Sequence, residues 1–177
     1  MLTIDAAPRH AAAIAAADEL LGKQRIERLF VGSVARAAWL GGSVDAGSID
    51  VLALMQPQQK SNVAMMASNR GFAVYREEIE ATAELDLVPL TFGGVRVHVL
   101  VASNALYARM FASAHVGRVL NPSGELEVRV PSAEDLALLL KMSDDDDGVR
   151  ALAAGAEFDR ARYNETLISI GLGALVV

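Results

Sequence analysis

The chain has 177 residues, of which 53% are hydrophobic, and a formal net charge of −6 with a sequence pI near 5.0. This length fits one domain with a continuous core, whereas the acidic balance argues against nucleic acid as a partner, because phosphate binding needs lysine and arginine. The absence of cysteine excludes disulfides, thiolate nucleophiles and cysteine zinc sites, and three scattered histidines do not favour a histidine-rich metal cage.

The N-terminal 22 residues are rich in alanine but contain charged side chains such as Asp5, Arg9 and Glu19. They therefore lack the uninterrupted apolar region of a signal peptide. No stretch of the sequence approaches the roughly 20 apolar residues that span a bilayer. We expect a cytoplasmic protein with no membrane partner.

Hydrophobic periodicity and the positions of glycine and proline predict helices that alternate with strands in the first half of the chain. Two strands are well defined: residues 28–31, which stop at Gly32-Ser33, and residues 49–54, which the charge of Asp50 interrupts. The elements predicted for this half are a helix over 9–21 with Gly22 as its C-cap, a strand over 28–31, a helix over 34–40, a loop over 41–47, a strand over 49–54 and a helix from 57 to 69.

The second half contains a predicted hairpin. Strands over 85–90 and 95–101 flank a glycine-containing loop over 91–94, so they should pair antiparallel. Residues 72–84 are ambiguous, with a strand over 72–75 and a helix over 76–84 as one interpretation. The remaining predicted elements are a helix over 104–115, a strand over 124–130, a helix from Ser132 as N-cap to about 142, and a helical region over 150–169.

This order of elements predicts an α/β (α+β) fold: one mixed β-sheet with an antiparallel hairpin, flanked by helices. We find no repeat, linker or second domain, so residues 1–177 are predicted to form one domain with a core over about 25–142 and a C-terminal helical region over about 150–177. The apolar tail 172–177 fits a last strand, a core plug or a subunit contact.

The Gly32-Ser33 turn and Asp50 are the main candidates for chemistry. A glycine–serine turn at a helix N-terminus presents backbone N–H groups and a hydroxyl in a positive dipole field, which suits phosphate. A carboxylate on the following strand can hold the Mg²⁺ that accompanies the phosphate. Ser48, two residues before Asp50, should share its face of the strand.

These residues resemble the signature of the nucleotidyltransferase superfamily, in which a Gly-Gly or Gly-Ser after a strand and a helix precede an Asp-x-Asp or Asp-x-Glu pair. Later segments at 97–102, 107–114 and 130–136 look like elements of bacterial toxin-type and related orphan nucleotidyltransferases, so the resemblance covers about residues 25–142. It implies a nucleoside triphosphate as ligand and Mg²⁺ as cofactor. The implied nucleotide-binding residues are Gly32, Ser33, Arg36, Ser48 and Lys141, with Asp50 as metal ligand.

The acidic motif departs from the family pattern. Ser48 stands at an acidic position, His98 stands where the third carboxylate is usual, and Lys141 falls one residue later than the family lysine. The predicted catalytic set is Asp50, Asp86 and His98. Asp86 lies on the other predicted hairpin strand, and the sequence does not say whether it or His98 is nearer Asp50. This set suits a single Mg²⁺ better than two bridged metals.

Each candidate also has a structural interpretation. Asp50 in an apolar strand needs a partner, and Arg36 or Arg96 would serve. His98 lies among valines, where a neutral hydrogen-bonded histidine is common, and Asp86 fits a solvated strand face. The run 144–147 lacks the alternating ligands of an EF-hand and fits a solvated loop.

The leading functional hypothesis is a nucleotidyltransferase-like protein that binds a nucleoside triphosphate with Mg²⁺ and, where active, transfers a nucleoside monophosphate to a hydroxyl acceptor. The alternative is a catalytically degenerate member that works by binding a protein, as a regulatory or toxin–antitoxin-type module or a homodimer. In a third interpretation the motif is accidental and the chain is another α/β module.

Overall fold

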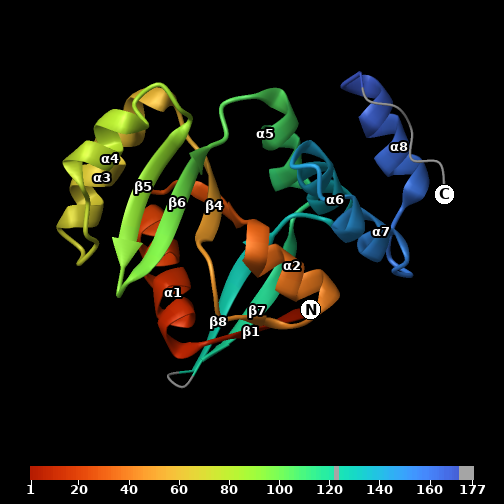
Figure 1. Ribbon diagram of the computed structural model, residues 1–177, viewed down its shortest axis with the longest axis horizontal. Helices are drawn as coiled ribbons and strands as arrows, with labels where there is room; N and C mark the ends of the chain where they lie inside the picture. Colours follow the sequence, from red (N-terminus) through yellow and green to blue (C-terminus); the bar gives the residue numbers. More distant parts are fainter. Residues whose placement is uncertain (122–123, 172–177) are drawn as a thin grey trace.

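The computed structural model describes residues 1–121 and 124–171 (Figure 1). Within these residues the strands are β1 (Leu2–Ala6), β2 (Glu27–Phe30), β3 (Ser43–Val44), β4 (Ile49–Leu54), β5 (Leu87–Phe92), β6 (Val95–Val101), β7 (His115–Asn121) and β8 (Gly124–Val130). The helices are α1 (Pro8–Lys23), α2 (Gly32–Leu40), α3 (Lys60–Ser68), α4 (Arg76–Ala81), α5 (Ala105–Ala112), α6 (Ala133–Met142), α7 (Asp146–Ala153) and α8 (Arg160–Ser169), with a 3₁₀ turn at Pro57–Gln59.

The strands form two mixed four-stranded sheets, with orders β3-β1-β7-β8 and β2-β4-β6-β5. The mixed α/β fold and the antiparallel hairpin, β5 with β6, are confirmed, but the expectation of one sheet is wrong. The second sheet depends on β1 and β7, which the sequence analysis did not predict and which pair in parallel, with Ile4 opposite Val119. Such pairing is set by tertiary contacts rather than by local periodicity.

Several predicted boundaries also change. Helix α1 continues through Gly22 to Lys23 and ends at Gln24; Gly22 is not the C-cap, and a Cβ there would lie 3.0 Å from the guanidinium of Arg28. The predicted loop 41–47 contains β3. The hairpin turn is the shorter Gly93-Gly94 pair, both with positive φ, and Asp86 therefore precedes β5 instead of lying on it.

Predicted boundaries in the C-terminal half also differ from those in the structure. His115, predicted as the end of a helix, begins β7, and the single helical region becomes α7 and α8. Helix α7 begins inside the acidic run: Asp145 is its N-cap, accepting from the N–H of Gly148 at 2.9 Å. Carboxylates at a helix N-terminus are favoured by the dipole, so only the first part of the run is loop.

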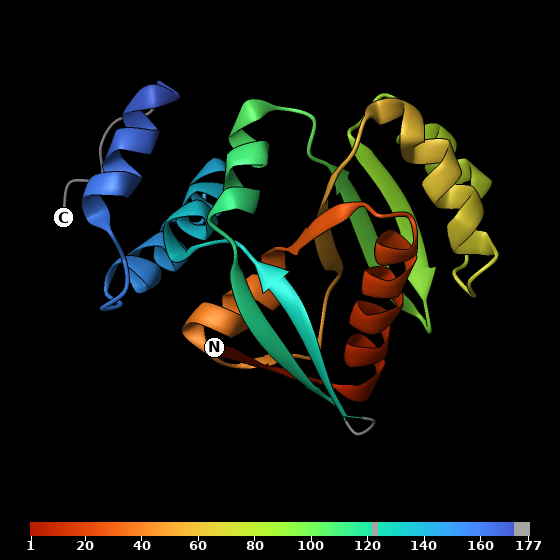
Figure 2. The ribbon, with the colours of Figure 1, turned by 180° about the vertical axis from the view of Figure 1, so that it is seen from behind.

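Helix α1 packs against strands of both sheets (Figure 2). Strand β6 alternates regularly, with Val97 and Val99 in the core. Because side chains alternate along a strand, His98 and Leu100 face the opposite side of the sheet, toward the region covered by α5 and α6. This alternation positions the candidate site.

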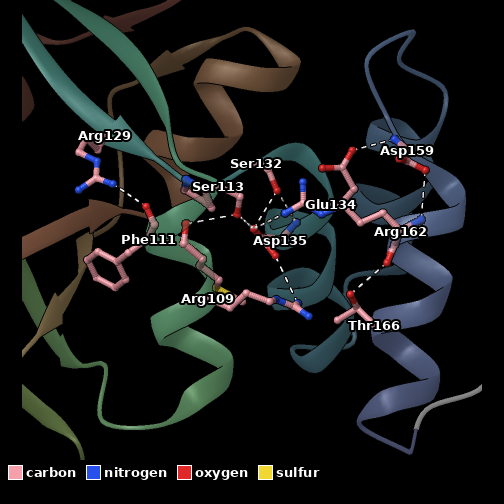
Figure 3. A network of polar contacts seen from close by, with 12 residues as sticks. Arg109, Phe111, Ser113, Arg129, Ser132, Glu134, Asp135, Asp159, Arg162 and Thr166 are labelled. Carbon is pink, nitrogen blue, oxygen red and sulfur yellow. Dashed lines mark hydrogen bonds and ion pairs between the residues drawn. The ribbon is translucent and has the colours of Figure 1, made fainter.

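Helices α6 and α8 are joined through buried carboxylates near the start of α6 (Figure 3). Ser132 caps α6, as predicted, by accepting from the N–H of Asp135 at 3.2 Å. Glu134 accepts the N–H of Asp159 at 2.7 Å, at the N-cap of α8. Asp135 faces Arg162 of α8 at 3.7 Å.

Tyr163 provides a prediction about the packing of α8. Its side chain is 1% exposed, and its hydroxyl has no hydrogen-bond partner among residues 1–121 and 124–171. A buried hydroxyl without a partner is destabilising, so Tyr163→Phe is expected to raise the free energy of unfolding at pH 7 by about 1 kcal/mol. Urea denaturation measures this, and a loss of stability would show that the hydroxyl makes a favourable contact.

The same variant should change how the free energy of unfolding depends on pH in the alkaline range. Burial, with a smaller contribution from the charge of Asp146, raises the pKa of Tyr163 above its ordinary value. The folded state then holds the phenolic proton more tightly than the unfolded state. The stability this confers is present below a pH of about 10 and is lost as the pH rises further. The free energy of unfolding of Tyr163→Phe should therefore decline less steeply above that pH than that of the wild type.

No helix within the described ranges, 1–121 and 124–171, has the length and apolar character needed to cross a membrane. The apolar tail 172–177 lies outside the described residues. The prediction of a single domain stays a prediction.

Candidate functional site

The turn between β2 and α2 depends on Gly32. Its φ is +55°, a left-handed conformation that favours glycine. The N-cap residue, Val31, has an extended backbone and no side-chain oxygen to accept from the first turn of α2. The Ser33 hydroxyl donates to the carbonyl of Ser48 at 3.1 Å, which ties the turn to the segment before β4. The first-turn N–H groups of α2 are thus not capped by a side chain.

Asp50 lies directly beside this turn because β2 and β4 are antiparallel neighbours, with Phe30 opposite Val51. Asp50 Oδ1 accepts the Ser48 hydroxyl at 2.9 Å and lies 2.9 Å from Nδ1 of His98. The other carboxylate oxygen, Oδ2, faces Gly32: a Cβ built on that glycine would lie only 2.6 Å from it. A side chain at position 32 would therefore collide with this carboxylate.

His98 is the partner of Asp50 because β4 and β6 run in parallel with these two residues in register. Both side chains are largely buried, with 29% of the His98 and 27% of the Asp50 side chain exposed. A hydrogen bond from Nδ1–H to the carboxylate leaves Nε2 of the neutral imidazole as an acceptor. The pair can thus orient one carboxylate and present one basic nitrogen.

The structure answers the question of which residue is nearer Asp50. Asp86 is exposed in the turn before β5, and β5 begins with Leu87 opposite Leu100, beyond His98 along β6. The Asp86 carboxylate is therefore separated from the Asp50–His98 pair.

The basic residues singled out by the sequence analysis pair with carboxylates other than Asp50. Arg36 pairs with Asp145, and Arg96 pairs with Glu78 at 2.9 Å, so the alternative in which one of them neutralises Asp50 is wrong. Lys141, on α6, contacts Asp146 at 2.7 Å. Lys141 stabilises the charged form of Asp146, because its hydrogen bond and its charge lower the pKa of that carboxyl group.

The ligand set is small for a metal site. In the part of the chain that the structure describes, no group of three or more histidine, aspartate or glutamate side chains could hold a metal ion. The residues present do not fit a two-metal centre, which requires bridging carboxylates. They do fit one Mg²⁺ that takes a single carboxylate and fills its other positions with phosphate oxygens and water.

A cavity of about 340 Å³ adjoins Asp50, between the sheet and helices α5 and α6. Its apolar lining includes Leu52 and Leu100 from the sheet and Leu136, Leu139, Leu140 and Met142 from α6. The sequence analysis predicted this segment only as a helix and did not predict the cavity. The leucine run 138–140 covers more of the helix surface than one stripe, and this was the available signal.

No protein-family model matches this chain, and no curated protein matches it. A solved structure of ANT(2")-Ia in complex with adenylyl-2"-tobramycin is similar in overall fold, with a TM-score of 0.49, 12% sequence identity, and coverage of 91% of this chain and 95% of that chain. This is a weak likeness to an aminoglycoside nucleotidyltransferase.

Proposed function

We propose that the protein binds a nucleoside triphosphate together with one Mg²⁺ between the Gly32-Ser33 turn and Asp50. One observation carries this proposal: Asp50 Oδ2 lies so close to Gly32 that a Cβ on that residue would be 2.6 Å from it. Gly32 begins a helix that has no side-chain N-cap. First-turn N–H groups and the helix dipole attract phosphate. A carboxylate at the same place repels phosphate unless a cation lies between them, which is why Mg²⁺ is part of the proposal.

Each residue then has a defined role. The N–H groups at the start of α2 bind phosphate oxygens, and Asp50 Oδ2 binds Mg²⁺. The Ser33 hydroxyl would have to exchange the Ser48 carbonyl for a phosphate oxygen. Ser48 and His98 hold the carboxylate in place through its other oxygen. Arg36 and Lys141 would each have to exchange a carboxylate partner for phosphate. Both pairs are exposed enough to be screened by solvent, so this exchange is energetically accessible.

Transfer chemistry has less support than binding. In transfer, an acceptor hydroxyl oxygen would bond to the α-phosphorus, the bond to the pyrophosphate oxygen would break, and a base would take the hydroxyl proton. Nε2 of His98 would be the base in this scheme, but Asp50 is the only carboxylate of the predicted catalytic set at the site, because Asp86 lies away from it. We therefore propose nucleotide binding with slow or absent transfer.

The test is calorimetric titration with each of the four common nucleoside triphosphates, with and without Mg²⁺. We expect Mg²⁺-dependent binding by the wild type and at least tenfold weaker binding by Asp50→Asn, since one charge-assisted metal contact is lost. The matched control is Asp86→Asn, the same isosteric change at an exposed carboxylate away from Gly32, which should bind normally.

Two outcomes contradict the proposal. Absence of heat with every nucleotide, from protein shown to be folded by circular dichroism, would exclude the site and favour the alternative of a protein-binding module. Equal loss of affinity in Asp86→Asn and Asp50→Asn would show that a general change in charge, rather than the Gly32–Asp50 contact, controls binding.

A further inference from the structure

The cavity beside Asp50 has a composition that the proposed nucleotide site does not explain. A triphosphate requires cations and N–H groups, whereas the wall that α6 contributes is formed by leucine and methionine side chains. Met142 is 51% exposed, so water reaches this apolar wall in the absence of a ligand. Exposed apolar side chains that line a concave surface are typical of small-molecule sites.

The polar groups in the lining are few. Of the described residues, Asp50 is the only charged side chain that lines the cavity, and Tyr107 and Ser143 add hydroxyl groups. The Ser143 hydroxyl donates to the carbonyl of Leu139 at 3.1 Å, so its proton is already used. The cavity therefore offers one anionic acceptor in a mostly apolar surface that also contains two hydroxyl groups and the backbone of Gly32. The carboxylate favours a hydrogen-bond donor, most strongly a cationic one.

The size of the cavity restricts the occupant. A volume of about 340 Å³ is near the lower limit of small-molecule pockets, roughly 300–1,000 Å³. A peptide helix or a nucleic acid strand is too large for it, and a triphosphate is too highly charged for its apolar wall. We infer that the cavity binds a compact, mostly apolar molecule with one amino or hydroxyl group, which donates to Asp50.

This inference goes beyond the proposed nucleotide site and does not depend on it. Mg²⁺ and phosphate would use the first turn of α2, whereas the apolar body of this second ligand would use α6. The two sites share Asp50 and Gly32, which both line the cavity. Only the assignment of the second ligand as acceptor in a transfer reaction would rest on the proposed function.

The test uses three probes with a common phenyl ring: benzylamine, benzyl alcohol and benzoate. Each is titrated into the full chain, and binding is followed by the methyl NMR signals of Leu139, Leu140 and Met142. We expect shifts of these signals with benzylamine and benzyl alcohol. Benzylamine should bind at least about tenfold more tightly than benzoate, because the carboxylate of Asp50 attracts one and repels the other.

Two variants separate the contributions. Asp50→Asn should reduce the preference for benzylamine over benzoate to about threefold or less, since the charge is removed. Leu139→Gln, on the α6 wall, should weaken benzylamine and benzyl alcohol alike by about fivefold, since apolar contact area is lost. The matched control is Ile168→Gln on α8, where the side chain is 64% exposed, and it should change neither affinity.

The inference is overturned if no probe shifts the three methyl signals at millimolar concentration, or if benzoate binds as tightly as benzylamine. Leu139→Gln keeps the test decisive if Asp50→Asn does not fold. Probe binding without any nucleotide binding would support this inference and contradict the proposed function, and the reverse result would do the opposite.

Discussion

Gly32→Ala is expected to lower the free energy of unfolding by about 2–4 kcal/mol and to remove nucleotide binding. A residue with a Cβ at φ +55° costs about 1–2 kcal/mol. The new Cβ would also lie 2.6 Å from Oδ2 of Asp50, so the carboxylate must move. That movement breaks its hydrogen bonds with Ser48 and His98, each of which contributes about 1 kcal/mol.

Gly93→Ala is the matched control for this variant. Gly93 has nearly the same φ, +54°, but a Cβ there would meet no atom within 4 Å among the described residues. It should therefore show the backbone cost alone, about 1–2 kcal/mol, and bind nucleotide normally. Urea denaturation of the two variants measures the difference, which isolates the contact with Asp50.

The binding measurement distinguishes loss of the site from loss of the fold. Gly32→Ala should be titrated with nucleotide at a temperature where circular dichroism shows it to be folded. Absent binding in Gly32→Ala with retained binding in Gly93→Ala would support a phosphate site at the turn. Equal destabilisation of both variants, with binding retained in both, would show that the approach of Asp50 to Gly32 has no functional consequence.

Asp135→Ala is expected to be the most destabilising single change away from the site, by about 3–5 kcal/mol. The Asp135 side chain is almost fully buried and accepts hydrogen bonds from Ser113 at 2.5 Å and Ser132 at 2.9 Å. Arg109 and Arg162 approach it at 3.6 and 3.7 Å (Figure 3). Its removal leaves two hydroxyls and two guanidinium groups without their common acceptor.

Two further variants show how much of this loss of stability comes from the charge of Asp135. Asp135→Asn keeps an oxygen acceptor for the serine hydroxyls but removes the charge that faces Arg109 and Arg162, so an intermediate loss of about 1–3 kcal/mol is expected. Asp147→Ala, at a highly exposed carboxylate paired with Arg150, should change stability by no more than about 0.5 kcal/mol. Chemical denaturation gives all three values.

Hydrogen exchange adds a spatial prediction for the same variants. Because Arg162 belongs to α8, the amides of that helix should lose protection in Asp135→Ala before those of the central sheets do. Uniform loss of protection across the molecule would instead show that Asp135 supports the whole fold rather than the attachment of α8.

Local sequence patterns were sufficient for the part of the site that lies within one short segment. The glycine at the strand-to-helix turn, the apolar strand that Asp50 interrupts, and the placement of Ser48 beside Asp50 all follow from spacing over a few residues. The hairpin and the Ser132 cap were predicted for the same reason. Turns, caps and alternation are local properties of a chain.

Only the tertiary structure decided the rest, because it depends on which distant segments pair and in what register. Parallel pairing of β4 with β6 places His98, rather than Asp86, against Asp50. The pairing of β1 with β7 divides the strands between two sheets. The cavity beside Asp50 arises where α6 is set against the sheet. Periodicity predicts which face of an element is apolar, but the neighbour of that face is selected by the packing of the whole chain.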